Sequence, residues 1–200
     1  MIRARTASQF SERQGRCSLT TMKRAVFIER DTLLNLATTQ GGQPPSPVLL
    51  EDFRLHDHAK SALERLKSAD FVLIATTNQP EISRGNLSRR DLDRMHEILR
   101  TTFPLDDILV CPHEEEDDCP CRKPRAGLFH EARFKWHLAF GQSFVISHRW
   151  QDATAAHIIG STSMLIQSPW LGRGHHDLVV RDLDAAVDKI LVHHLHRQVA

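Results

Sequence analysis

The chain of 200 residues lacks any apolar run of the roughly 20 residues that a helix needs to cross a bilayer. Its N-terminus also lacks the apolar core of a secretory signal. We therefore expect a soluble, cytoplasmic protein without a membrane partner. Because the sequence contains nothing like a coiled-coil seam, we also expect a monomer.

The sequence also lacks an excess of charge of either sign. Its 26 basic and 25 acidic side chains nearly cancel. This balance removes the long-range field that nucleic-acid binding or docking to an anionic membrane ordinarily needs. We therefore expect no nucleic-acid partner.

The first 21 residues differ in composition from the rest of the chain. They hold four arginines, one acidic residue and many serines and threonines, with no clear apolar period. We interpret residues 1–21 as a flexible leader; a transit peptide is the weaker alternative, and Met22 is an alternative start. Residues 22–200 are predicted to form one domain, because this length suits a single hydrophobic core.

From Lys23 onward, short apolar runs alternate with segments of helical period. This pattern is typical of an α/β fold with a mainly parallel sheet covered by helices. The expected strands contain residues 25–28, 71–75, 108–110, 144–146 and 164–166. Helices are expected at 56–67, at 88–101 with Ser88 as N-cap, and in a last segment whose buried stripe includes Leu183 and Val187.

Cysteine is scarce and unevenly distributed. Three of the four cysteines lie within eleven residues, beside a histidine, which favours metal over disulfide chemistry. The thiolates of Cys111, Cys119 and Cys121 and the imidazole of His113 can complete the closed tetrahedral shell of a structural zinc ion. We interpret residues 111–121 as a zinc-binding loop; a reduced, metal-free loop and a disulfide are the alternatives.

Polar side chains directly follow the expected strands. In an open parallel sheet, ligands bind beyond the carboxyl ends of the strands. These positions hold Glu29-Arg30-Asp31, Thr77-Asn78-Gln79, the Cys/His loop and Ser147-His148-Arg149. The sequence therefore predicts a functional site at this edge of the sheet.

Two cations, Arg122 and Lys123, come immediately after the Cys/His loop. A guanidinium and an ammonium can neutralise phosphate oxygens, so this pair favours a phosphorylated small molecule as ligand. The alternative is that the pair only offsets the acidic run at 114–118. That acidic run is also a weaker candidate for contact with a basic protein partner.

Four segments carry a family resemblance. They read AVFIERDTLLN, ATTNQPEISRG, CPHEEEDDCPCRKPRAGLF and SFVISHRWQDATAA, in that order. They resemble the four motif regions of haloacid-dehalogenase-type phosphatases, in the group that acts on heptose bisphosphate and histidinol phosphate. The resemblance covers residues 23–166 and implies a Rossmann-like three-layer fold with a minimal cap, and a sugar phosphate or similar phosphomonoester as ligand.

The resemblance also implies roles for individual residues. Glu29 occupies the position of the nucleophile, and Asp31 that of the general acid/base. Thr77 and Lys123 match phosphate-binding positions, and Arg122 matches a substrate-contacting position. Asn78, which follows Thr77, is a further candidate for the phosphate site.

The metal and nucleophile positions depart from the family pattern. The family's nucleophile is Asp rather than Glu29, the glycine after the second Asp is replaced by Thr32, and a magnesium-binding Asp is replaced by His148. Magnesium would have to be held by Glu29, Asp31, His148 and Asp152, although imidazole is a poor ligand for this ion. We therefore expect weak hydrolysis. The alternatives are a reaction with a softer metal at His148 and Asp152, and an inactive pseudophosphatase that binds a phosphorylated ligand or a protein partner.

Overall fold

The computed structural model describes residues 22–36, 47–168, 171–172 and 174–199. The expected leader at 1–21 lies outside these residues. Residues 22–36 and 47–168 include all four motif segments. Among the described residues, no helix combines the length and the apolar character that crossing a membrane requires.

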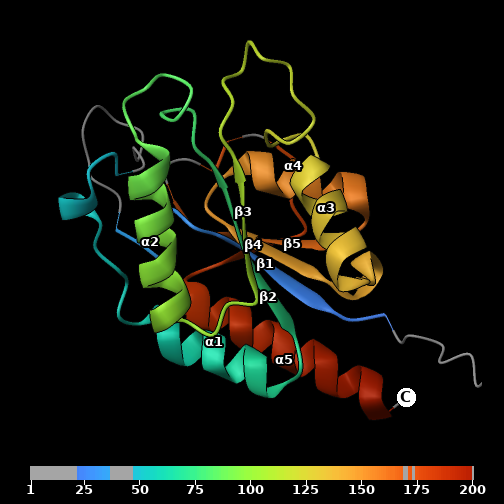
Figure 1. The fold of residues 1–200 in the computed structure, drawn as a ribbon. Helices are drawn as coiled ribbons and strands as arrows, with labels where there is room; N and C mark the ends of the chain where they lie inside the picture. Colours follow the sequence, from blue (N-terminus) through green and yellow to red (C-terminus); the bar gives the residue numbers. More distant parts are fainter. Residues whose placement is uncertain (1–21, 37–46, 169–170, 173, 200) are drawn as a thin grey trace, which may run out of the picture.

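Six parallel strands form one sheet in the order β3-β2-β1-β4-β5-β6 (Figure 1). The strands are β1 (Ala25–Glu29), β2 (Val72–Asn78), β3 (Asp107–Cys111), β4 (Phe144–Ser147), β5 (Thr162–Ile166) and β6 (Leu178–Val180). The five expected strands are confirmed, whereas the short β6 at the sheet edge was not predicted. All five residues of β1 are buried, as expected for a central strand of a sheet covered on both faces.

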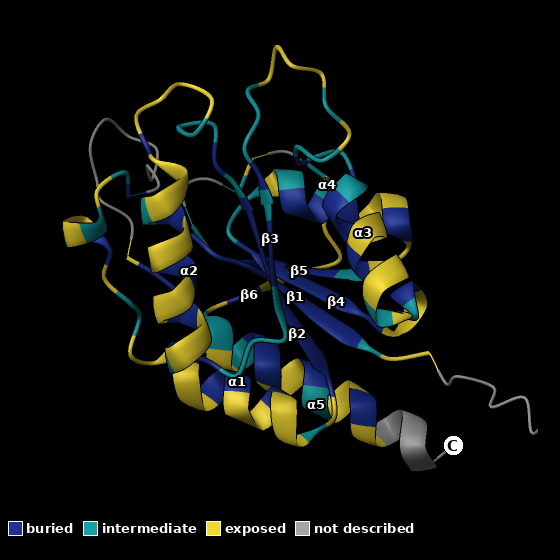
Figure 2. Ribbon diagram, viewed as in Figure 1, coloured by how far each residue is buried: buried dark blue, intermediate teal, exposed yellow. Residues whose placement is uncertain are grey.

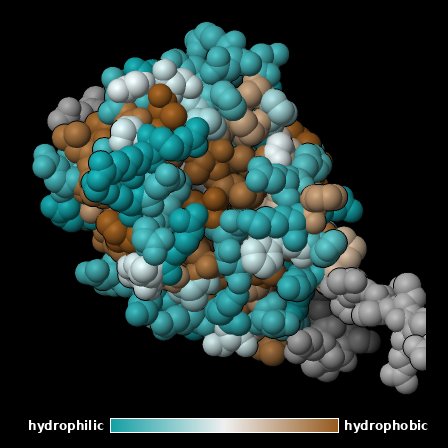
Figure 3. Space-filling model, in the orientation of Figure 1, coloured by the Kyte–Doolittle hydropathy of each residue, from teal (hydrophilic) through white to brown (hydrophobic). Residues whose placement is uncertain are grey.

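Helices cover both faces of the sheet and complete three layers (Figure 2). The helices are α1 (Ala59–Ser68), α2 (Arg89–Thr102), α3 (Gly127–Trp136), α4 (Trp150–Ile159) and α5 (Leu183–Val199), with short 3-10 turns η1 (Leu50–Asp52) and η2 (Phe140–Gln142). One core cluster joins α1, α2 and α5 to the sheet, and the other joins α3 and α4 to its opposite face. Hydrophilic side chains cover much of the surface shown in Figure 3.

The helix α2 begins where the sequence predicts. The Ser88 hydroxyl accepts a hydrogen bond from the Asp91 backbone N–H at 3.0 Å, so Ser88 is the N-cap. The apolar face of α2 buries Leu92, Met95 and Leu99 against the sheet. The fold class expected from the sequence is therefore confirmed, and the parallel strands bring their carboxyl ends to one edge.

Candidate active site and metal centre

The Cys/His loop begins at Cys111, the last residue of β3, and brings four metal-ligand atoms within 4.8 Å of one another. The Cys111 Sγ lies 3.6 Å from the Cys119 Sγ, and the Cys121 Sγ lies 3.4 Å from the Cys119 Sγ. The His113 Nδ1 lies 3.7 Å from the Cys111 Sγ and 3.2 Å from the Cys121 Sγ. A tetrahedral ion with bonds of about 2.0–2.3 Å has ligand-to-ligand edges of about 3.3–3.8 Å. The four separations lie in or close to this range, so the donor set suits one metal ion.

The structure joins none of these three cysteines to one another by a disulfide. A disulfide joins its sulfur atoms at about 2.05 Å, well below the separations seen here, and all three thiols are free. The start of α3 also contacts the loop, because the Gly127 N–H donates to the Pro120 carbonyl at 3.0 Å. A Cβ at Gly127 would meet the Pro120 oxygen at 2.3 Å, so only glycine permits this approach.

Arg122 is anchored to the metal-binding loop. Its Nη1 donates to the His113 carbonyl at 2.9 Å, and its Nε donates to the Glu115 carboxylate at 3.0 Å. Glu115 belongs to the acidic run at 114–118. Its contact with Arg122 is therefore the charge pairing that the sequence analysis gave as an alternative to phosphate binding. A role in substrate contact stays a prediction, since this guanidinium is partly committed to its own loop.

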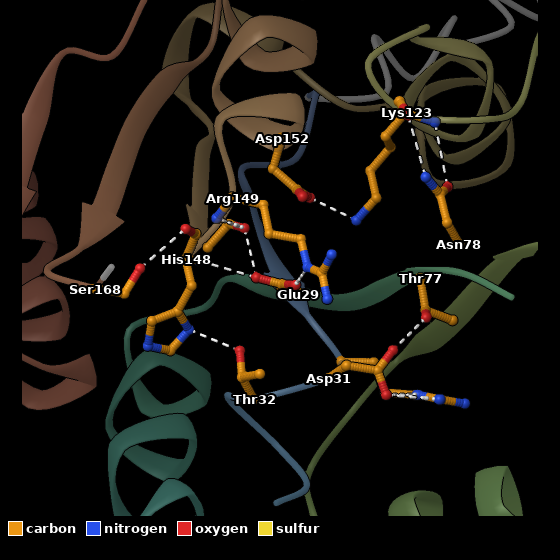
Figure 4. Close-up of polar contacts among 12 residues, drawn as sticks. Glu29, Asp31, Thr32, Thr77, Asn78, Lys123, His148, Arg149, Asp152 and Ser168 are labelled. Atoms are coloured by element: carbon orange, nitrogen blue, oxygen red, sulfur yellow. Dashed lines mark hydrogen bonds and ion pairs between the residues drawn. The ribbon is translucent and has the colours of Figure 1, made fainter. Parts of the chain in front are cut away.

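Lys123 is buried and points toward the carboxyl ends of the strands (Figure 4). Its Nζ donates to the Asp152 Oδ1 at 2.6 Å and to the Thr76 Oγ1 at 3.3 Å. The Asn78 side chain accepts from the Lys123 backbone N–H at 3.2 Å and donates to the Lys123 carbonyl at 3.1 Å. Asn78 therefore positions Lys123, a role that the sequence did not indicate; its contact with phosphate stays a prediction.

Asp31 lies just beyond β1 with both carboxylate oxygens engaged. Arg30 donates to Oδ1 through Nη2 at 2.7 Å and through Nε at 3.1 Å. Thr77 donates to Oδ2 at 2.7 Å, and the Gln79 amide donates to the same oxygen at 3.0 Å. Sequence reasoning missed Arg30 and Gln79 as partners of Asp31, although each lies within two residues of a predicted site residue.

His96 on α2 supports Arg30 from the buried side. The Arg30 side chain is fully buried, and its Nη1 lies 3.2 Å from the His96 Nε2. Burial, followed by the charge of Arg30, lowers the pKa of His96 to about 3, which leaves the imidazole neutral and able to accept from Arg30. No signal in the sequence distinguishes His96 from an ordinary helical histidine.

Glu29 ends β1 and turns its carboxylate toward the loop that follows β4 (Figure 4). The Ser147 hydroxyl and the His148 backbone N–H donate to Oε2 at 2.6 and 2.9 Å, and the Arg149 Nε donates to Oε1 at 2.6 Å. Burial, followed by the charge of Asp152, raises the pKa of Glu29, whereas the charges of Arg149 and Lys123 and the hydrogen bond from Ser147 oppose this rise. The sequence placed Arg149 at this edge without predicting its pairing with Glu29.

The imidazole of His148 contacts Thr32, whereas only the backbone N–H of His148 contacts Glu29. The His148 Nδ1 lies 2.8 Å from the Thr32 Oγ1. Burial, followed by the charges of His56 and Arg149, lowers the pKa of His148 to about 4, so the ring is neutral at neutral pH. Thr32 has φ of 74°, the left-handed conformation that glycine adopts at no steric penalty. Thr32, which replaces the family's glycine, therefore adopts a backbone conformation that is unfavourable for a β-branched residue.

Asp152 lies in the first turn of α4 and is fully buried. Its Oδ1 accepts from Lys123, and its Oδ2 has no hydrogen-bond partner among the described residues. The structure thus brings the carboxylates of Glu29, Asp31 and Asp152 to the same edge of the sheet as Thr77 and Lys123 (Figure 4). This edge of the sheet therefore holds three carboxyl groups beside a hydroxyl and a buried ammonium group.

Comparison with known proteins agrees with this architecture. No protein-family model matches the chain. A D-glycero-beta-D-manno-heptose-1,7-bisphosphate 7-phosphatase of Haemophilus ducreyi is 30% identical over 159 residues, which are 73% of this chain and 84% of that protein. A phosphatase of the same name from Helicobacter pylori is 29% identical over 175 residues, 84% of this chain and 97% of that protein.

A solved structure shares the fold. The D,D-heptose 1,7-bisphosphate phosphatase of B. bronchiseptica, solved with magnesium and phosphate, has a TM-score of 0.71 at 22% identity and covers 85% of this chain and 99% of its own. The Haemophilus relative shows the family, because its similarity extends over most of both chains. The chain belongs to the D-glycero-beta-D-manno-heptose-1,7-bisphosphate 7-phosphatase family of haloacid-dehalogenase-type phosphatases.

Proposed function

We propose that the chain binds the phosphate group of a sugar phosphate at the carboxyl ends of β1, β2 and β4. Lys123 supplies a buried positive charge, and Thr77 supplies a hydroxyl 2.7 Å from Asp31. Arg122 contacts the remainder of the ligand from the edge of the metal-binding loop. The names of the relatives make D-glycero-β-D-manno-heptose 1,7-bisphosphate the first ligand to test.

We propose further that zinc occupies the Cys/His loop and has a structural role. Three thiolates and one imidazole make a closed shell, so no position is left for a reacting group. When bound, zinc would be held by Cys111, His113, Cys119 and Cys121. It would fix the backbone from which Arg122 and Lys123 extend.

Hydrolysis at this site is proposed to be strongly attenuated, and the state of Glu29 carries this conclusion. As the nucleophile, Glu29 would form a bond to phosphorus while the ester P–O bond breaks and Asp31 protonates the leaving oxygen. Water would then release phosphate and regenerate Glu29. Both Glu29 oxygens already accept hydrogen bonds from three donors, and these contacts would have to break or rearrange before Glu29 could attack phosphorus.

The geometry of Glu29 adds a second obstacle to hydrolysis. Its extra methylene, relative to aspartate, displaces the carboxylate, and a displacement of about 1 Å can lower a rate on the order of 10²-fold. Both oxygens of Asp31 also accept hydrogen bonds within the protein, so its carboxyl group is engaged where it would have to face a leaving group.

A second candidate function is ligand binding without turnover. The ion pair between Arg149 and Glu29 favours it, because this pair neutralises the nucleophile position. The two candidates differ in phosphate release from the heptose bisphosphate at high protein concentration. Slow release supports attenuated hydrolysis; complete absence of release, together with protection of the protein against heat by the ligand, supports binding alone.

The binding experiment needs a variant that weakens the site without unpairing a buried charge. Arg122→Gln meets this need because Arg122 lies at the edge of the site, and Arg125→Gln in the same loop is the matched control. We expect heptose bisphosphate to raise the melting temperature of the unmodified chain and of Arg125→Gln, and to raise that of Arg122→Gln less. If the ligand leaves the melting temperature of the unmodified chain unchanged, the proposed function is wrong.

A further inference from the structure

We infer that the Arg149 guanidinium occupies the cation position of this site and excludes a divalent cation, so that phosphate binding is independent of magnesium. The family resemblance implies magnesium between the nucleophile and the acids of the first and fourth motifs. The part of the inference that concerns phosphate rests on the proposed function. The part that concerns the cation rests on the contacts of Glu29, Asp31 and Asp152.

The position of Arg149 is the first observation. Figure 4 shows its side chain extending from the loop after β4 to end beside Glu29. The Nε donates to the Glu29 Oε1 at 2.6 Å, and the guanidinium also interacts electrostatically with Asp31 and Asp152. A positive charge therefore already lies among the carboxylates that a magnesium ion would have to bind.

The oxygen atoms around this charge are the second observation. Both oxygens of Glu29 and both oxygens of Asp31 accept hydrogen bonds, and the Asp152 Oδ1 accepts from Lys123. Of the six oxygens, only the Asp152 Oδ2 has no hydrogen-bond partner among the described residues. Proteins usually hold magnesium through one or two carboxylates together with waters and phosphate oxygens. Here five of the six carboxylate oxygens already accept hydrogen bonds from protein donors, and a magnesium ion would have to displace these donors.

The charge balance is the third observation. Three carboxyl groups and three cations make up the cluster, and their charges sum to zero when all are ionised. The groups are Glu29, Asp31 and Asp152, with Arg30, Lys123 and Arg149. When no phosphate is bound, a divalent cation would add two uncompensated charges to this largely buried site, which is unfavourable.

His148 is the fourth observation. The resemblance implies an aspartate here as a magnesium ligand, but this position holds an imidazole whose Nδ1 is engaged with the Thr32 Oγ1 at 2.8 Å. A cation could enter this position only after the Arg149 guanidinium has left, and its departure would also release the Glu29 Oε1 from the ion pair. The two departures from the family pattern, Glu29 and His148, therefore both fit a site in which the Arg149 guanidinium takes the place of the metal ion.

The test uses the full chain loaded with zinc and freed of excess metal. Mn²⁺ serves as a paramagnetic probe of the magnesium position, and its binding is measured by electron paramagnetic resonance with competition by Mg²⁺. Inorganic phosphate serves as the ligand, and its effect on the melting temperature is measured with and without Mg²⁺. The variants are Arg149→Gln, the charge-retaining Arg149→Lys, and Arg181→Gln as a control at an exposed ion pair.

We expect the unmodified chain, Arg149→Lys and Arg181→Gln to bind no Mn²⁺ that Mg²⁺ displaces, whereas Arg149→Gln binds it. Phosphate should raise the melting temperature of the unmodified chain equally with and without Mg²⁺. Mn²⁺ binding to the unmodified chain, or a lack of Mn²⁺ binding to folded Arg149→Gln, would overturn the inference, as would phosphate protection that requires Mg²⁺. If phosphate protects under neither condition, the proposed function fails, while the Mn²⁺ measurement still decides the inference.

Discussion

The Nε of Arg149 donates to the Oε1 of Glu29 at 2.6 Å, and this ion pair links the nucleophile position to the fourth motif. The longer side chain of glutamate reaches the loop after β4, where Ser147 and His148 also donate to it. An aspartate at position 29 would end nearer to β1. The pair therefore depends on the extra methylene of Glu29, and it commits the carboxylate to a partner within the protein.

Restoring the family residues should restore hydrolysis. In the double variant Glu29→Asp with His148→Asp, the shorter carboxylate withdraws from Arg149, so the guanidinium loses the ion pair that holds it at the cation position. A second carboxylate also becomes available for magnesium. We expect magnesium-dependent release of phosphate from heptose 1,7-bisphosphate to rise by roughly 10- to 100-fold, in line with the sensitivity of rates to a displacement of about 1 Å. Glu29→Asn with His148→Asp is the control without a nucleophile, and an equal gain in that control would refute the explanation.

Removing the metal should disorder the Cys/His loop. Binding of structural zinc is coupled to folding and contributes on the order of 10 kcal/mol in small zinc domains, so the loop should lose its order when the metal is stripped. We expect Cys119→Ser to lose bound zinc, measured by mass spectrometry of metals, and to exchange the backbone amides of residues 111–123 faster. Cys17→Ser, outside the described residues, should retain zinc. Unchanged exchange after loss of zinc would show that the metal does not hold the loop.

At position 32, glycine should give a more stable protein than alanine. A residue with a side chain in the left-handed conformation is destabilised by about 1–2 kcal/mol, and Thr32 has φ of 74°. We therefore expect Thr32→Gly to be more stable than Thr32→Ala by about 1 kcal/mol, measured by denaturant unfolding. At the exposed Glu97, inside α2, the order should reverse, with alanine more stable than glycine by about 1 kcal/mol. The same order at both positions would contradict the backbone assignment.

His96 should make stability depend on pH. Its pKa is lowered to about 3 in the folded protein, so below its ordinary value of about 6.5 the unfolded chain binds more protons than the folded chain. Stability should fall as the pH is lowered through this window and be fully present above it. We expect His96→Gln to reduce the slope of unfolding free energy against pH by at most about 1.4 kcal/mol per pH unit. The exposed His176→Gln is the control; equal slopes for His96→Gln and the unmodified chain would show that His96 does not titrate on unfolding.

The sequence was sufficient to predict most of the fold. Buried parallel strands such as β1 read as continuous apolar runs, and Ser88 marked the start of α2. The strand β6 was missed because two of its three residues are exposed and it is very short. The helix α4 was not among the expected helices, because its buried residues are mostly alanines and include Asp152, which give no clear apolar stripe.

The residues of the candidate site could be predicted from the sequence, but the hydrogen bonds and ion pairs between them could not. Spacing alone brought Cys111, His113, Cys119 and Cys121 together, because all four lie in one short loop. The partners of Glu29 and Asp31 depend on side-chain reach across neighbouring strands, which a linear pattern does not encode. The direction of a guanidinium after β4, and hence the contact of Arg149 with Glu29, follows only from the packed structure.

The central claim is that the site binds a sugar phosphate while Arg149 holds the nucleophile position inactive. The most direct measurement is phosphate release from D-glycero-β-D-manno-heptose 1,7-bisphosphate by the zinc-loaded chain at high concentration, with and without Mg²⁺, alongside heat protection by the same ligand. The account predicts clear protection, with release that is slow or absent and unchanged by Mg²⁺. Rapid release that requires Mg²⁺ would contradict it.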